Sequence, residues 1–418
     1  MLGLIGIAGF SGHGRPTHGA RVAAGSVEVT YASRAALARA LSARPARLLC
    51  VVAPLHVAAL RPWGATAAYL RAVRRLPGIV SARPTVGRRA AVSTAGGAAP
   101  ALGSSSTALA REWQYYAVGE DQVSPAVLAA AAHITIAVVD TGADVAAPTL
   151  AGKVRGVYDV RTGRHRVTDN DGHGTFVASL AGGANPVGRG VVGFGGAARL
   201  LVVKVSNSTT FDDVDVAGGI VYAVRHGARI VNLSVAGHDP SLVEKAALEF
   251  AARRGVLVVA AAGNDALAGD PAEYPAALLQ PVGSNGVGGL GLSVGASDSN
   301  GARAGFSEYG SFVSLAAPGV AVLGALPGRT SSHPSRSRAR SLSRSSYGYA
   351  SGTSFAAPEV AGAAALVWAA DPKLTFRQVA AILEQTASGQ GVWSPELGFG
   401  VIDVAAAVQR AAAAASAG

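Results

Sequence analysis

Four polar residues have the types and positions that one kind of catalysis requires: Asp140, His173, Asn264 and Ser354. A nucleophilic serine needs a base that takes its proton, a carboxylate that orients the base, and donors for the oxyanion that forms. Asp140 and Asn264 each follow an apolar segment, ITIAVV and VLVVAAAG, and Ser354 precedes a small-residue helix in SGTSFAAPEVAG. The four residues therefore favour hydrolysis by a nucleophilic serine.

Each of these residues also has a simpler interpretation. Ser354 stands where a helix begins, with Pro358 four positions later, and a serine there commonly caps the helix. Asp140 would cap a turn at a strand end, His173 would lie in a glycine-flanked loop or cap a helix, and Asn264 would form a turn. Taken singly, each residue favours the simpler reading. Their occurrence together, in the order Asp, His, Ser, favours the catalytic one.

The elements that must position these residues follow an alternating pattern from about residue 113. Short segments that are apolar on both faces alternate with helical ones, which predicts a parallel sheet covered by helices. Ligands of such sheets bind beyond the carboxyl ends of the strands, where Asp140 and Asn264 would lie. The predicted strands are 134–140, 199–205, 228–235 and 255–264, and the predicted helices are 213–227 and 241–255.

The N-terminal part has a different organisation. Residues 26–90 predict a small α+β unit, with strands at 26–31, 46–53 and 79–86 and helices at 33–43 and 65–78. We divide the chain into a tail or signal remnant (1–25), this unit (26–90), an Ala/Gly/Ser-rich linker (91–112), a catalytic domain (113–410) with an Arg/Ser-rich insertion (329–346), and a second tail (411–418).

Composition excludes several classes of protein. The net charge of +11 is concentrated in residues 1–112, which hold fourteen arginines and two acids, whereas the rest holds 22 basic and 23 acidic residues. No aromatic RNA-binding signature accompanies the arginines, so we predict no nucleic-acid partner. Apolar runs fall short of the ~20 residues of a membrane span. Cys50 is the only cysteine, so no intrachain disulfide can form.

Four motifs, VVDTG, GHGTFVAS, AAAGN and GTSFAAP, together resemble those of the subtilisin-like serine proteases, or subtilases. The likeness covers about residues 113–410, and the order Asp, His, Ser is that of subtilisin. It implies an α/β, three-layer domain with a mostly parallel central sheet, preceded by a small α+β propeptide-like domain. It also implies that Ser354 is the nucleophile, His173 its base and Asp140 the partner of His173, with Asn264 and the Ser354 N–H as oxyanion donors.

The resemblance extends to substrate binding and maturation. A peptide would pair as an added strand with the segment ARIVNLSVAG. We therefore expect a secreted, monomeric endopeptidase made as a precursor, whose partners are protein or peptide substrates and its own propeptide. The residues implied in substrate binding are Ser234, Val235, Ala236 and Gly237 on the substrate strand, and Ala261, Ala262 and Gly263 in a wall of the primary specificity pocket.

Several positions depart from the family pattern. Thr149 replaces an aspartate that supplies a calcium ligand in many relatives, so we do not assume that calcium site. We name no metal-ligating residue and predict no cofactor for the chemistry, which leaves a structural calcium without support. Glu273, in AEYPAA, stands where the pocket floor often has a small residue. It is either a surface acid or, if it faces the pocket, a partner for Arg or Lys before the scissile bond. In the second case Arg88, Arg89 and Arg111 are candidate maturation sites. Ala236, Ser351 and Glu359 depart from a common glycine, asparagine and histidine.

Two alternative functions make different demands on the sequence. A catalytically silent subtilase fold that acts as a binding module would not require the intact set of Asp140, His173, Asn264 and Ser354. An esterase of the α/β-hydrolase class would require a Gly-x-Ser-x-Gly elbow and the order Ser, acid, His. The segment GTSFA lacks that elbow and the order here differs, which leaves the endopeptidase as the prediction.

Overall fold

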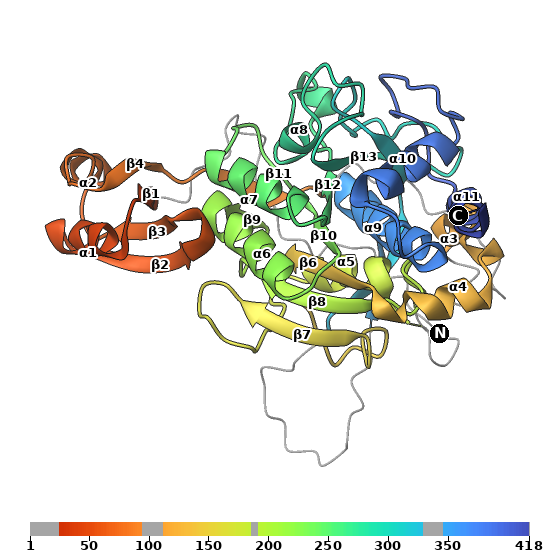
Figure 1. The fold of residues 1–418 in the computed structure, drawn as a ribbon, viewed down its shortest axis with the longest axis horizontal. Helices are drawn as coiled ribbons and strands as arrows, with labels where there is room; N and C mark the ends of the chain where they lie inside the picture. The colour runs from red at the N-terminus through yellow and green to blue at the C-terminus, as the bar shows by residue number, and fades with distance from the viewer. Residues whose placement is uncertain (1–24, 94–111, 185–190, 329–345, 418) are drawn as a thin grey trace, which may run out of the picture.

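A seven-stranded sheet forms the centre of the computed structural model, which describes residues 25–93, 112–184, 191–328 and 346–417. The strand order is β14–β13–β12–β10–β6–β8–β7, and every neighbouring pair is parallel (Figure 1). This confirms the predicted α/β class. The strands are β6 (Thr135–Asp140), β7 (Val154–Asp159), β8 (Arg199–Lys204), β10 (Ile230–Leu233), β12 (Leu257–Ala261), β13 (Gly291–Ser297) and β14 (Leu315–Pro318).

Helices cover both faces of the sheet because its inner strands are apolar on both sides. Strand β6 illustrates this: Ile136 and Val138 belong to one apolar core, and Ala137 and Val139 belong to the other. The first core contains helices α5 (His173–Gly182) and α9 (Thr353–Ala370), and the second contains α6 (Asp213–Arg225) and α7 (Leu242–Ala252). The three-layer arrangement places the starts of α5 and α9 at the carboxyl edge of the sheet.

Smaller elements complete this domain. Residues 411–417, which the sequence suggested were a tail, continue the last helix. The other helices are α3 (Trp113–Ala117), α4 (Pro125–Ala130), α8 (Ala276–Leu279), α10 (Phe376–Thr386) and α11 (Val404–Ala417), and strands β15 (Val322–Leu326) and β16 (Ser346–Ala350) form a hairpin. None of the helices within the described ranges has the length and apolarity needed to cross a membrane.

The N-terminal unit is a separate small sheet in the order β2–β3–β1–β4, with helices α1 and α2 (Figure 1). Strand β3 was not predicted, because LLCVVAPLHVAAL reads as one apolar run. The turn Ala53–Leu55 and His56, with φ +55°, divide that run into two antiparallel strands. The elements are β1 (Val27–Tyr31), α1 (Arg34–Ala43), β2 (Ala46–Val52), β3 (Val57–Pro62), α2 (Thr66–Val73) and β4 (Ile79–Pro84).

One face of the small sheet packs against α6. Cys50, Val52 and Val57 share an apolar core with Val214 and Val221 of that helix. Burial of this kind contributes about 25 cal/mol per Å² of apolar surface removed from water. The small unit is thus held to the larger domain by apolar contact, in addition to the peptide chain that joins them. The predicted insertion 329–346, the linker from 94 on and the tail 1–24 lie almost entirely outside the described residues.

Three buried carboxyl groups lie near one another: Glu359 on α9, Glu112 at the start of α3 and Glu120 shortly after that helix. The Val192 N–H donates to Glu112, but Glu120 and Glu359 have no hydrogen-bond partner among the described residues. Burial raises the pKa of Glu112 to about 8. Burial, followed by the charges of neighbouring acids, raises the pKa of Glu120 and of Glu359 well above the ordinary value. The raised pKa values favour the protonated form of these carboxyl groups in the folded protein.

This cluster predicts that the folded state loses stability as the pH rises. Each carboxyl binds a proton in the folded state above pH 4.5 and loses it on unfolding, so stability falls by about 1.4 kcal/mol per pH unit per group until the folded pKa is passed. We expect Glu359→Gln to raise the unfolding temperature more at pH 8 than at pH 5. Glu249→Gln, at a half-buried position on α7, is the control. Thermal unfolding with an equal effect of Glu359→Gln at both pH values would contradict the prediction.

Candidate active site

Asp140 and His173 meet at the carboxyl edge of the sheet. Asp140 is the last residue of β6 and His173 the first of α5, and the Asp140 Oδ1 to His173 Nδ1 distance is 2.8 Å. A Cβ on Gly174 would lie 2.1 Å from the Gly142 carbonyl oxygen, so only glycine permits this close approach. Burial lowers the pKa of His173, but Asp140 opposes and outweighs that effect, so the pKa is raised. The pair can hold a proton on the imidazole.

Ser354 lies one residue into α9, and its side chain does not cap the helix. Gly352 is the N-cap and no side chain caps it, which excludes the capping interpretation. The Ser354 hydroxyl donates to the Ser234 carbonyl at 2.8 Å, while the buried Nε2 of His173 has no partner among the described residues. The hydroxyl therefore has to rotate toward His173 before it can transfer a proton.

Pro358, within α9, leaves the Ser354 carbonyl available for a hydrogen bond from outside the helix. Because proline has no N–H, the Ser354 carbonyl four residues earlier loses its helical hydrogen bond. The Ser234 hydroxyl donates to that carbonyl instead, at 2.7 Å. The start of α9 is therefore hydrogen-bonded to Ser234, in the segment after β10.

The Asn264 side chain is oriented by Thr353. Both the N–H and the hydroxyl of Thr353 donate to Asn264 Oδ1 at 3.0 Å. The Nδ2 group of Asn264 is buried and has no partner among the described residues. A buried, unpaired donor is costly, and one that is held in place is suited to an oxyanion that forms only during reaction.

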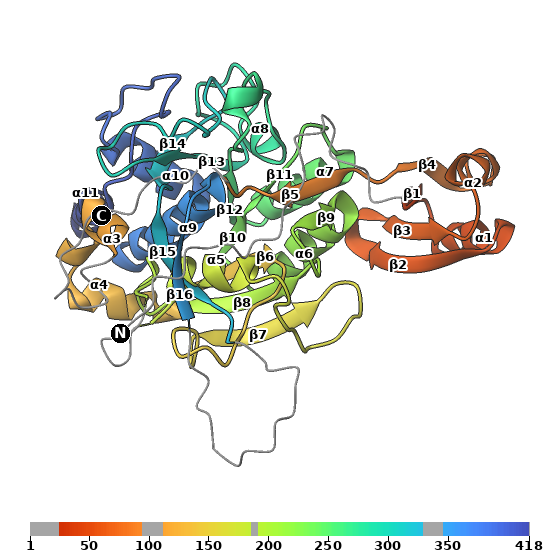
Figure 2. The ribbon, with the colours of Figure 1, turned by 180° about the vertical axis from the view of Figure 1, so that it is seen from behind.

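A segment that precedes the domain of the seven-stranded sheet runs past these groups, and we call the path that it occupies the cleft. Strand β5 (Gly87–Ala90) lies between β11 (Val235–Ala236) and β9 (Thr210–Asp212) and is antiparallel to both (Figure 2). The Ala91 carbonyl then accepts a hydrogen bond from the Ser354 N–H at 3.0 Å. The cleft therefore holds an extended peptide whose Ala91 carbonyl lies at the N-terminus of α9.

Gly352 and Ser351 lie directly beside this segment, and both contact its backbone. A Cβ on Gly352 would lie 2.4 Å from the Ala91 carbonyl oxygen, so glycine is required where the segment passes. Ser93 N–H donates to the Ser351 carbonyl at 2.8 Å, which extends the pairing beyond Ala91. The predicted substrate residues Ser234–Gly237 border this segment, with Ala236 opposite Arg89.

Arg88 and Arg89 of this segment form ion pairs with acidic residues of the larger domain. Arg88 donates from Nε and Nη2 to Glu244 on α7, and both side chains are fully buried. Arg89 Nη2 lies 2.6 Å from both Asp265 and Glu273. Burial raises the pKa of Glu244, and the charge and hydrogen bonds of Arg88 offset part of that rise.

Glu273 is fully buried, which excludes its interpretation as a surface acid. A Cβ on Gly263 would lie 2.3 Å from Glu273 Oε2, so this carboxylate occupies space beside the wall formed by Ala261, Ala262 and Gly263. Its partner is Arg89, two residues before Ala91. Burial raises the pKa of the nearby Glu308 to about 10, so that residue adds no charge at neutral pH.

Metal binding has little support in these residues. Thr149 is buried and its hydroxyl lies 3.1 Å from that of Tyr347, which leaves this position without a carboxylate for calcium. Among the described residues, ligand atoms of His238, Asp265 and Glu273 lie within 4.8 Å of one another. The Arg89 guanidinium contacts two of the three, so an organic cation takes that place.

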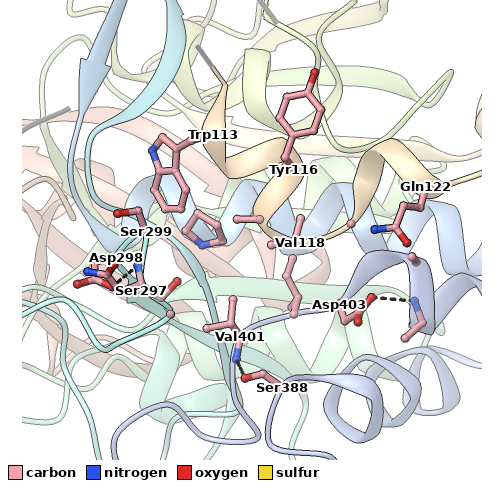
Figure 3. Close-up of a pocket in the computed structure, with 18 of the residues that line it drawn as sticks. Trp113, Tyr116, Val118, Gln122, Ser297, Asp298, Ser299, Ser388, Val401 and Asp403 are labelled. Atoms are coloured by element: carbon pink, nitrogen blue, oxygen red, sulfur yellow. Dashed lines mark hydrogen bonds between the residues drawn. The ribbon is translucent and has the colours of Figure 1, made fainter. Parts of the chain in front are cut away.

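A separate pocket of about 740 Å³ lies between α3, α11 and the loop after β13 (Figure 3). Asp298 and Asp403 at its border accept hydrogen bonds from nearby backbone N–H groups, and Trp113 and Tyr116 line another side. None of the four proposed catalytic residues borders it. Its size alone does not make it the reactive site.

Comparison with known proteins decides the family. The sequence model of the subtilase family matches residues 131–400. The chain belongs to the subtilase family. Subtilisin amylosacchariticus from Bacillus subtilis subsp. amylosacchariticus is 34% identical over 285 residues, which are 66% of this subtilase and 66% of that protein. Subtilisin Savinase from Lederbergia lenta is 35% identical over 278 residues, which are 66% of this chain and 91% of that protein.

A solved structure resembles a larger part of this subtilase. The structure of fervidolysin from Fervidobacterium pennivorans, described as a keratinolytic enzyme related to subtilisin, matches 92% of this chain and 61% of its own with a TM-score of 0.73 and 27% identity. The likeness supports the subtilisin-like fold.

Two residues of the cleft were not identified from the sequence: Glu244 and His238. Glu244 interrupts the buried face of α7, between Val243 and Ala247, and an acid at such a position was a usable signal. His238 carries no comparable local signal. Arg88 was a candidate maturation site from the sequence, but its pairing with Glu244 was not predicted. Arg111, a candidate maturation site from the sequence, lies outside the described residues.

Proposed function

We propose that this subtilase is a serine endopeptidase that cleaves peptide bonds through an acyl-enzyme. The observation that carries the proposal is the peptide segment in the cleft, with the Ala91 carbonyl on the Ser354 N–H and the His173–Asp140 pair beside it. Similarity to subtilisins supports the same activity. An extended substrate would pair with β11 as β5 does.

In the proposed reaction, the rotated Ser354 hydroxyl attacks the substrate carbonyl carbon while His173 Nε2 takes its proton. The oxyanion accepts hydrogen bonds from the Ser354 N–H and Asn264 Nδ2, and Asp140 stabilises the imidazolium. The C–N bond then breaks as His173 returns the proton to the leaving amine. Water, activated by His173, hydrolyses the resulting ester and frees Ser354. Both donors are supplied by the protein without rearrangement of its backbone.

The same proposal assigns residues 26–90 as a propeptide and 113–410 as the catalytic domain of a secreted, monomeric enzyme. The Ala91 carbonyl accepts a hydrogen bond from the Ser354 N–H, which supports cleavage of the Ala91–Val92 bond rather than cleavage after Arg88 or Arg89. After cleavage, the segment ending at Ala91 would remain as a bound product and inhibit the enzyme.

Labelling and N-terminal sequencing test this function. We expect a new N-terminus to appear at Val92 in the purified full-length protein, and a fluorophosphonate to modify Ser354 once the segment that ends at Ala91 has been released. The heat-unfolded protein is the control, because only an activated serine reacts readily. An intact chain that takes no label would favour the catalytically silent binding module. A labelled protein with another N-terminus would retain the activity and overturn the cleavage site.

A further inference from the structure

We propose that the cleft selects substrates with arginine at the third and fourth residues before the cleaved bond, followed by two small residues. The inference rests on the proposed endopeptidase function and names its substrate class. It comes from the segment in the cleft, in which Arg88 and Arg89 precede Ala90 and Ala91. The acids that hold these arginines belong to the catalytic domain, so they remain when the segment leaves.

The preference for arginine should be stronger at the fourth residue before the cleaved bond, the place of Arg88. Glu244 is fully buried, and the Arg88 Nε–H lies 3.1 Å and 3.2 Å from its two carboxylate oxygens. Arg88 Nη2 makes a further contact with the same carboxylate, and Nη1 donates to the Gly87 carbonyl at 2.9 Å. A planar guanidinium makes such a paired contact, whereas a lysine ammonium offers only a point charge. A neutral side chain would leave a buried acid unpaired.

The third position has a more exposed acidic site. The Arg89 side chain is 32% exposed and contacts Asp265 and Glu273, while His238 Nε2 lies 2.8 Å from Asp265. Hydrogen bonds to Glu273 raise the pKa of His238. Partial exposure weakens an ion pair. We therefore expect a smaller preference at the third position than at the fourth.

The backbone pairing of the segment with β11 fixes which side chain of a bound peptide meets each acidic site. Ala90 and Arg89 pair with Val235 and Ala236 of β11, and Ala91 N–H donates to Ser234. A substrate whose reactive carbonyl meets the Ser354 N–H would adopt this register and point its fourth residue at Glu244. Glu273, beside Gly263, limits the space near the residue before the bond, which is consistent with Ala91 there.

Quenched fluorescent peptides with the sequence GRRAAVS provide the test. With wild-type enzyme, we expect kcat/KM to fall about 30-fold or more when the first arginine becomes glutamine. Replacement of the second arginine should cost about 2- to 5-fold. In Glu244→Gln the first arginine should lose most of its advantage. Glu249→Gln, which changes a half-buried glutamate on the same helix that pairs with Lys245, should keep the wild-type preference.

The concentration of active sites is measured by fluorophosphonate titration, and the rates are divided by it. A change in peptide preference is thereby distinguished from a loss of active enzyme. Wild-type enzyme that takes the label but cleaves both peptides equally would overturn the inference and leave the proposed function intact. Absence of labelling and of casein hydrolysis would instead contradict the proposed function. If Glu244→Gln fails to fold, the peptide comparison on wild-type enzyme still decides the preference.

Discussion

Ser354→Ala is expected to lower turnover by about 10⁶-fold, the size of the effect when subtilisin loses its serine, and to leave the chain uncleaved at Ala91–Val92. Alanine cannot attack the carbonyl, while the backbone N–H that contacts Ala91 remains. Peptide hydrolysis and the mass of the purified chain measure the two effects. Little loss of stability is expected, because only one hydroxyl hydrogen bond, to Ser234, is removed.

The control for this prediction is Ser416→Ala, on the exposed end of α11, which should retain full activity. The protein must be free of host proteases, since cleavage in trans would conceal the effect. If Ser354→Ala still matured alone at the wild-type rate, the assignment of the nucleophile would be incorrect.

Asn264→Ala is expected to lower kcat by about 10² to 10³ with little change in KM. The Nδ2 group has no partner in the described structure, so it is free to bind the charge that develops on the carbonyl oxygen. An interaction made mainly in the transition state affects kcat rather than ground-state binding. Steady-state kinetics with the GRRAAVS peptide separate the two constants.

Asn300→Ala, in the exposed turn after β13, is the matched control and should leave both constants unchanged. A tenfold rise in KM for Asn264→Ala with unchanged kcat would mean that this amide binds the substrate uniformly. In that case the oxyanion would depend on the Ser354 N–H and other donors.

Local sequence was sufficient for much of the framework. The strands that precede Asp140 and Asn264 are continuous apolar runs, and their burial on both faces required the observed parallel sheet with helices on each side. The small-residue start of α9 likewise indicated where Ser354 lies. Strand β3 was missed because a proline turn within an apolar run gives no change of periodicity.

The sequence by itself determined the α/β class, the family motifs and the candidate residues Asp140, His173, Asn264 and Ser354, because each depends on a short pattern of apolar, glycine and polar residues. Only the tertiary structure decided that residues 87–93 lie in the cleft, that Arg88 pairs with Glu244, 156 residues away, and that buried Glu273 meets Arg89 rather than the residue before the bond. Such contacts depend on strand register and on how distant segments pack, and a short motif encodes neither.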